Sequence, residues 1–86
     1  NQNNKQEGFI TIEVTKEGRY SVNEIPVEST DLNTLVSKIK VASEGKTDIP
    51  IIINADALAT HQAVVNVMEA SRLAGLNKIT FSTKLK

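Results

Sequence analysis

The order in which two hydrophobic periodicities follow one another is the feature that most constrains the fold of this chain. Alternation of apolar and polar residues, typical of a strand with one buried face, occurs over 9–15, 20–23 and 78–83. Apolar residues spaced as on one face of a helix occur over 31–44 and 61–74. The chain is therefore predicted to mix strands and helices within one short sequence.

A β-branched run, Ile51-Ile52-Ile53, lies between the two helical segments and is typical of a strand covered on both faces. The predicted order is β-β-α-β-α-β. We expect the first two strands to form a hairpin around Gly18, and the last two to be parallel strands of a right-handed βαβ unit. The predicted fold class is α+β, a mixed sheet with two helices packed on one face.

Turn and capping residues set the expected element boundaries. The segment Ser29-Thr30-Asp31 and Thr60 offer side-chain oxygens that can cap exposed N–H groups where helices begin, and Gly45 and Gly75 are expected helix stops. The segment 23–26 is predicted to be a turn, because its proline cannot donate a hydrogen bond to a strand ladder.

The composition excludes several classes of protein. A chain of 86 residues forms one small domain, and without cysteine it has no disulfide and no thiolate metal site. Ten basic and ten acidic residues give no net charge, and aromatics make up 3%. Both values argue against nucleic-acid binding through a basic surface or through base stacking. No apolar run approaches the roughly 20 residues that span a bilayer.

Candidate chemical residues are few, and we expect no enzyme, no catalytic residue, no metal and no cofactor. His61 is the single histidine, and we expect it to be exposed in the first turn of a helix. Asp56 follows the central strand, at the end of a sheet where ligands often bind. Asp56 and His61 are therefore the ligand-loop candidates. The alternative, which we favour, is that the Asp56 carboxylate accepts backbone N–H groups in the loop 56–60.

Four segments in order resemble the ExbD/TolR family. They are YSVNEIPV at 20–27, IIINAD at 51–56, VVNVM at 64–68 and AGLNKI at 74–79. In that family a strand ends in an Ala-Asp pair, a Val-rich helix follows, and an Ala-Gly stop leads to a final strand. The resemblance covers about residues 9–83, and its order and spacing are more specific than any single motif.

The resemblance implies that residues 9–86 are the periplasmic domain of a single-pass inner-membrane protein. Residues 1–8 would be a flexible linker from a missing transmembrane anchor. Such proteins work with an ExbB/TolQ-like channel partner as a proton-driven motor that energises a TonB- or TolA-like protein. We favour the ExbD-like branch. The alternative is a TolR-like module that binds peptidoglycan in a Tol-Pal-type envelope-integrity system. We expect the protein to form a homodimer and not to bind nucleic acid.

The resemblance also indicates a partner-binding site on the final strand, at Ile79, Thr80, Phe81 and Ser82. An extended segment would pair with this strand edge through main-chain hydrogen bonds. Phe81 occupies a position where family members carry a large apolar residue linked to partner function. The alternative interpretation is that Phe81 is an ordinary core residue of the final strand. The family often has tyrosine at the position of His61, so a contact that the tyrosine ring makes in family members is not assigned to His61.

Overall fold

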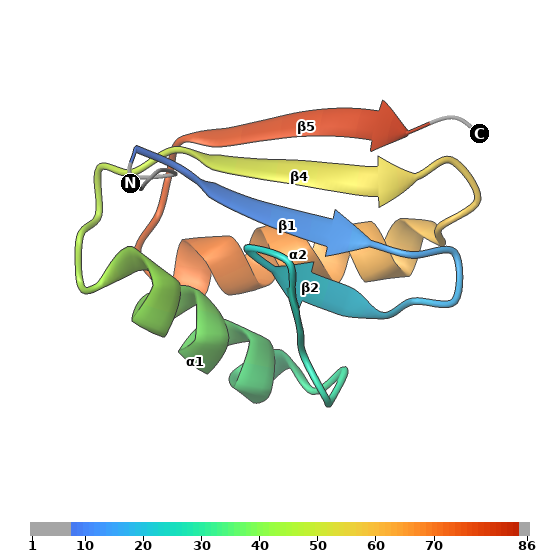
Figure 1. The fold of residues 1–86 in the computed structure, drawn as a ribbon, viewed down its shortest axis with the longest axis horizontal. Coiled ribbons are helices and arrows are strands. Elements are labelled where there is room, and N and C mark those ends of the chain that lie inside the picture. The colour runs from blue at the N-terminus through green and yellow to red at the C-terminus, as the bar shows by residue number, and fades with distance from the viewer. Residues whose placement is uncertain (1–7, 85–86) are drawn as a thin grey trace, which may run out of the picture.

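Five strands and two helices form two layers in the computed structural model, which describes residues 8–84. Figure 1 shows both helices against the same face of the sheet. The predicted α+β class is therefore confirmed, and the predicted linker falls almost entirely outside the described residues. The elements in chain order are β1 (Ile10–Val14), β2 (Tyr20–Val22), β3 (Ile25–Pro26), α1 (Leu32–Ser43), β4 (Ile51–Asp56), α2 (His61–Leu73) and β5 (Ile79–Lys84).

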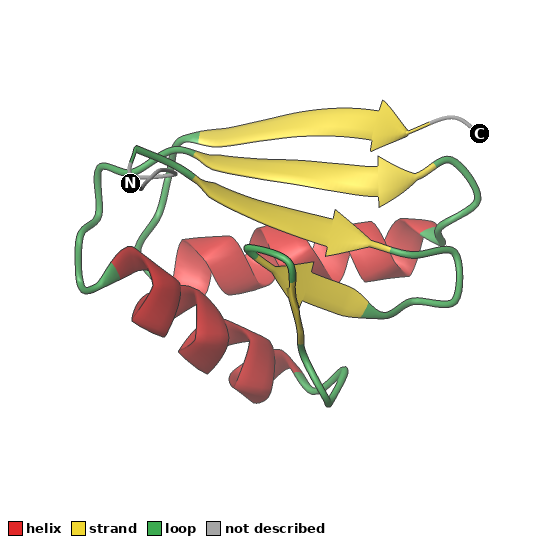
Figure 2. Cartoon of the chain, viewed as in Figure 1, coloured by secondary structure: helices red, strands yellow, loops and turns green. Residues whose placement is uncertain are grey.

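The strands lie in the order β3-β2-β1-β4-β5, so β3 and β5 are the two edges of the described sheet. The first two strands form the expected antiparallel hairpin, and β3 extends it with a further antiparallel pair. β1 and β4 pair in parallel, as do β4 and β5, which confirms the parallel strands predicted on either side of α2. Figure 2 shows that the short β2–β3 hairpin and the long parallel strands belong to one twisted sheet.

The core lies between the sheet and the helices and is built from alternate strand residues. Ile12 and Ile53 are in register in β1 and β4, and neither is exposed to solvent. Burying side chains of this size stabilises the fold by about 1.5–3 kcal/mol each. The sheet is also joined to α2 by Tyr20, whose hydroxyl donates to the Ala63 carbonyl oxygen at 3.4 Å.

Neither of the two described helices lies over the outer face of the sheet, so the prediction that Ile51-Ile52-Ile53 is covered on both faces is wrong. Ile51 and Ile53 are fully buried, but Ile52 points to the outer face and is only half-buried. Its neighbours in register are Thr11 and Thr80. A continuous β-branched run raises strand propensity at every position. It does not determine whether a helix packs on each face of the strand.

The segment around Pro26 forms a strand where a turn was predicted over 23–26, so that prediction is wrong at its second half. Val22 pairs with Ile25, and Ser21 pairs with Pro26. In a hairpin with a two-residue turn, the pair next to the turn exchanges hydrogen bonds and the following pair does not. Pro26 occupies the second position, so its missing N–H removes no bond from the ladder.

Both helices begin at the predicted capping segments, and Asp31 is the residue of Ser29-Thr30-Asp31 that caps α1. The Asp31 carboxylate accepts from the Thr34 N–H at 3.3 Å, and the Thr60 hydroxyl accepts from the Ala63 N–H at 3.1 Å. α2 ends just before Gly75, which has a φ of +93° and so leaves the helix in a conformation that favours glycine. Within residues 8–84, no helix has the length and apolar character needed to cross a membrane.

Candidate functional site

The loop after β4 shows what Asp56 and His61 do. The Asp56 carboxylate accepts from the Leu58 N–H at 2.8 Å, and the Asp56 carbonyl accepts from the Ala59 N–H at 2.9 Å. His61 is exposed in the first turn of α2, as expected. No hydrogen bond or ion pair joins the two side chains. Asp56 therefore holds a tight turn between β4 and α2, which matches the alternative favoured from the sequence.

Groups that could carry out chemistry are not assembled in the described part of the chain. Residues 8–84 contain no cluster of three or more histidine or acidic side chains that could hold a metal ion. Ser71 is fully buried, and its hydroxyl donates to the Val67 carbonyl oxygen at 2.9 Å. That hydroxyl is used inside the helix and is out of reach of a substrate.

The turn between β2 and β3 is held by Asn23. Asn23 and Glu24 both have positive φ, of +51° and +71°, which is rare for residues other than glycine. The Asn23 side-chain oxygen accepts from the Thr11 N–H at 3.0 Å, and the Asn23 N–H donates to the Thr11 carbonyl at 2.8 Å. Asn23 thus bonds to β1 in both directions. This contact was missed from the sequence, because its partner lies twelve residues earlier.

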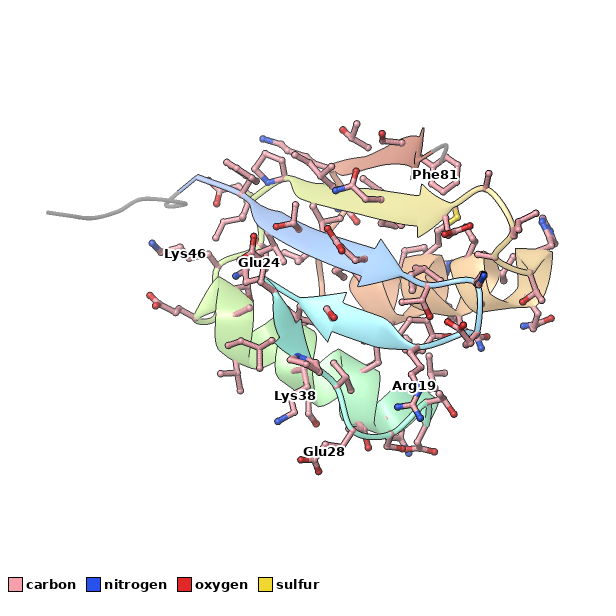
Figure 3. The ribbon with its side chains drawn as sticks, turned by 45° about the vertical axis from the view of Figure 1, so that its right-hand side comes forward. Arg19, Glu24, Glu28, Lys38, Lys46 and Phe81 are labelled. Carbon is pink, nitrogen blue, oxygen red and sulfur yellow. The ribbon has the colours of Figure 1, made fainter. Side chains whose placement is uncertain are left out.

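The predicted partner-binding residues lie on β5, at a sheet edge. Phe81 is in register with Ile53, so its side chain is on the helix side of the sheet. Phe81 is nevertheless 50% exposed, because α2 packs mainly on β1 and β4 and β5 extends beyond it. Thr80 and Ser82 are on the outer face and are exposed. Figure 3 shows Phe81 at this edge, away from α1.

The main chain of β5 faces β4 at alternate residues. The Ile51 N–H donates to the Lys78 carbonyl oxygen at 2.8 Å, so the Lys78 carbonyl points toward β4. Successive peptide groups of a strand point in opposite directions. The main chain of Thr80 therefore faces β4, and that of Phe81 faces away. We call the side of β5 away from β4 the β5 edge.

The four predicted residues thus contribute to the β5 edge in two different ways. Ile79 and Phe81 turn main-chain groups outward, although the Ile79 N–H already donates to the Asn77 carbonyl at 3.1 Å. Thr80 and Ser82 instead turn their main chain inward and offer side chains on the outer face. The Phe81 N–H and carbonyl therefore lie at the middle of an edge that pairs with no other strand among residues 8–84, and such an edge can accept an added strand.

A second apolar feature lies at the opposite side of the molecule, between the β2–β3 hairpin and α1. Ile25 and Val41 are 67% and 74% exposed there. They line a shallow groove together with Val22, Asn23, Val27, Lys38 and Ala42. Its neighbouring strand, β3, has only two residues, so this side offers far less main chain to an extended partner than β5 does.

Comparison with known proteins identifies the family. The model of the family "Biopolymer transport protein ExbD/TolR" matches residues 1–86. The chain is also similar to three proteins named "Biopolymer transport protein ExbD" from Neisseria meningitidis, of serogroup A (serotype 4A, strain DSM 15465 / Z2491), serogroup B (strain ATCC BAA-335 / MC58) and serogroup C. Each is 28% identical over 89 residues, which cover 99% of this chain and 62% of the relative.

The chain thus spans somewhat under two thirds of the length of these relatives. The family match extends over the whole sequence, and the four motifs that carry the resemblance fall on β2–β3, β4, α2 and the segment that leads from α2 into β5. The order of motifs in the sequence is therefore the order of elements in the fold. This chain belongs to the ExbD/TolR family of biopolymer transport proteins.

Proposed function

We propose that residues 9–86 form the periplasmic domain of a motor subunit driven by the proton-motive force. The subunit is anchored in the inner membrane by one helix and is a homodimer. With an ExbB/TolQ-like channel partner, it energises a TonB-like protein for transport across the outer membrane. The support comes from membership of a biopolymer transport family and from the β5 edge, which no other described strand pairs with and which carries the half-exposed Phe81.

The β5 edge carries the proposal because it offers main-chain groups and a half-exposed aromatic ring to an extended segment. An extended segment of the TonB-like protein would add to the sheet beside β5 and bond to the outward main chain of Phe81. β5 is paired along its length with β4, and β4 with β1. A strand added at this edge would be held by the same sheet whose inner face forms the core, so force applied to it would pass into the most buried part of the domain.

Titration of the ¹⁵N-labelled chain with a peptide from the periplasmic linker of a TonB-like protein tests this proposal. We expect chemical-shift changes centred on Phe81 and its β5 neighbours. Phe81→Ala should weaken binding, and Ile25→Ala serves as the matched control because Ile25 is an exposed apolar residue at the opposite edge. Peptide in large excess with no shift on β5 would contradict the proposal.

The membrane anchor has its own test in the coding sequence before Asn1. The proposal expects an apolar segment of about 20 residues there that carries one acidic residue. A coding sequence that begins at this point, or that continues into a polar domain, would contradict it.

A TolR-like function in binding peptidoglycan is the second candidate, favoured by the polar outer face of the sheet. Thr11, Asn54 and Ser82 offer hydroxyl and amide groups there, and no described helix covers them. Sedimentation with purified sacculi separates the two candidates. Retention that is lost when Asn54 is replaced by leucine would favour the wall-binding function, and free passage would favour the TonB-like partner.

A further inference from the structure

The charge of this chain is unevenly distributed, although its net charge is zero. Four of the ten basic residues lie in 70–86, and that segment has no acidic residue. Residues 1–69 carry all ten acidic residues and six basic ones. Lys78 comes directly before β5, and Lys84 is its last residue. The β5 edge is therefore bounded by positive charge within a chain that is otherwise acidic.

The two lysines lie at opposite ends of the strand, on the same alternate set of positions as Thr80 and Ser82. At about 3.3 Å per residue, they are roughly 20 Å apart. Lys78 is exposed and forms no salt bridge with another described residue. Lys84 is in register with Asp56, the nearest acidic position in the sheet.

We infer that the β5 edge takes an extended acidic segment in which apolar and polar side chains alternate. This inference rests on the proposed function, because it specifies the chemistry of the partner at the same edge. Apolar side chains of the segment would lie on the helix side beside Phe81, and polar ones on the outer face beside Thr80 and Ser82. Carboxylates about six residues apart would lie at the two ends of β5, where Lys78 and Lys84 stand in the sequence. Main-chain bonds and Phe81 would supply affinity, and the charges would supply selectivity and speed of encounter.

The opposite edge of the sheet differs from β5 because it has acidic residues close to its strand. Glu24 is in the turn before β3, and Glu28 is two residues beyond that strand. Figure 3 shows both glutamates on the side of the molecule away from Phe81. Figure 3 also shows Lys38 and Lys46 on that side, so charges of both signs lie there, whereas residues 70–86, which contain β5, have basic residues and no acidic one.

Four capped heptapeptides test the inference by titration of the ¹⁵N-labelled chain. The first, EVTVTVE, has acids at both ends and three apolar positions on one face. QVTVTVQ removes the charge, KVTVTVK reverses it, and EGSGSGE keeps the acids without the apolar face. We expect EVTVTVE to shift β5 resonances and to bind at least about fivefold more tightly than KVTVTVK at low salt. The difference should shrink in about 0.5 M salt, where charges are screened.

Matched variants assign the preference to the proposed lysines. In the double variant Lys78→Gln, Lys84→Gln, the preference for EVTVTVE over QVTVTVQ should disappear. The control is Lys38→Gln, Lys46→Gln, which removes the same charge from the side of the molecule opposite Phe81, as Figure 3 shows. That control should keep the preference.

The outcomes separate this inference from the proposed function. Equal binding of EVTVTVE, QVTVTVQ and KVTVTVK at β5 would overturn the acidic preference and leave edge binding intact. Binding of EGSGSGE as tight as that of EVTVTVE would overturn the alternating pattern, because charge alone would then suffice. Shifts confined to residues away from β5, or none with any peptide, would overturn both the inference and the proposed docking edge.

Discussion

Replacing Asn23 tests how the β2–β3 hairpin is held. The Asn23 side-chain oxygen accepts from the half-buried Thr11 N–H at 3.0 Å, and Asn23 has a φ of +51°. Loss of such a bond costs about 1 kcal/mol. An alanine in the left-handed region costs roughly a further 1 kcal/mol, because its Cβ approaches the carbonyl that follows it. Asn23→Ala should therefore lower the free energy of unfolding by about 2 kcal/mol.

Two matched substitutions separate these contributions. Asn23→Asp keeps a side-chain acceptor on a residue that tolerates positive φ, so it should cost no more than about 0.5 kcal/mol. Asn23→Gly keeps the favourable backbone conformation and loses the bond, so it should fall between aspartate and alanine. Urea unfolding followed by circular dichroism measures all three, and a loss of about 2 kcal/mol lowers Tm by roughly 10 °C in a domain of this size.

Equal stability of the alanine variant and the parent chain would refute this account of the hairpin. If aspartate destabilised as much as alanine, the hydrogen bond to Thr11 would not be the cause. If glycine destabilised as much as alanine, the backbone conformation of Asn23 would not contribute. Below the unfolding transition, none of the three Asn23 substitutions should change peptide binding at β5, because the β2–β3 hairpin lies at the other side of the sheet.

Three further predictions concern single residues. Phe81→Ala should cost only about 1 kcal/mol of stability because the ring is half-exposed, whereas Ile53→Ala in the core should cost about 2–5 kcal/mol. Thermal unfolding compares the two variants, and equal losses would place Phe81 in the core. Thr60→Ala should remove about 1 kcal/mol by uncapping α2 while Thr60→Ser keeps the stability, and urea unfolding with no loss in the alanine variant would contradict the capping role. Asp56→Asn should leave stability nearly unchanged because it retains the acceptor for the Leu58 N–H, whereas Asp56→Ala should lose about 1 kcal/mol in the same assay. An asparagine variant as unstable as the alanine variant would show that the charge of Asp56 matters and the hydrogen bond in the turn does not.

Local signals in the sequence were enough to predict both helices. Asp31 and Thr60 act on N–H groups only three residues away, so their pattern is visible in a short window. The parallel pairing of β4 and β5 also follows from a local unit, since a strand, a helix and a strand in succession have few ways to pack.

Features that depend on distant partners could not be predicted in the same way. The role of Asn23 requires Thr11 on another strand, and the pairing of Pro26 requires the register of β3 against β2. The half-exposure of Phe81 depends on β5 being the last strand of the sheet and lying beyond α2. The resemblance proposes residues 79–82 as a partner-binding site, and only the direction of the main chain in the structure shows that Phe81, unlike Thr80, turns its main-chain groups away from β4.

Hydrogen exchange at single amides of β5 tests the central claim most directly. The chain is saturated with a TonB-like linker peptide, or with EVTVTVE, and amide exchange is followed by NMR. If a strand adds at the β5 edge, the Phe81 amide should exchange about tenfold or more slowly in the complex. The amides of Thr80 and Ser82, which already face β4, should change much less. An unchanged rate at Phe81 in the saturated complex would contradict the claim that this edge binds the partner.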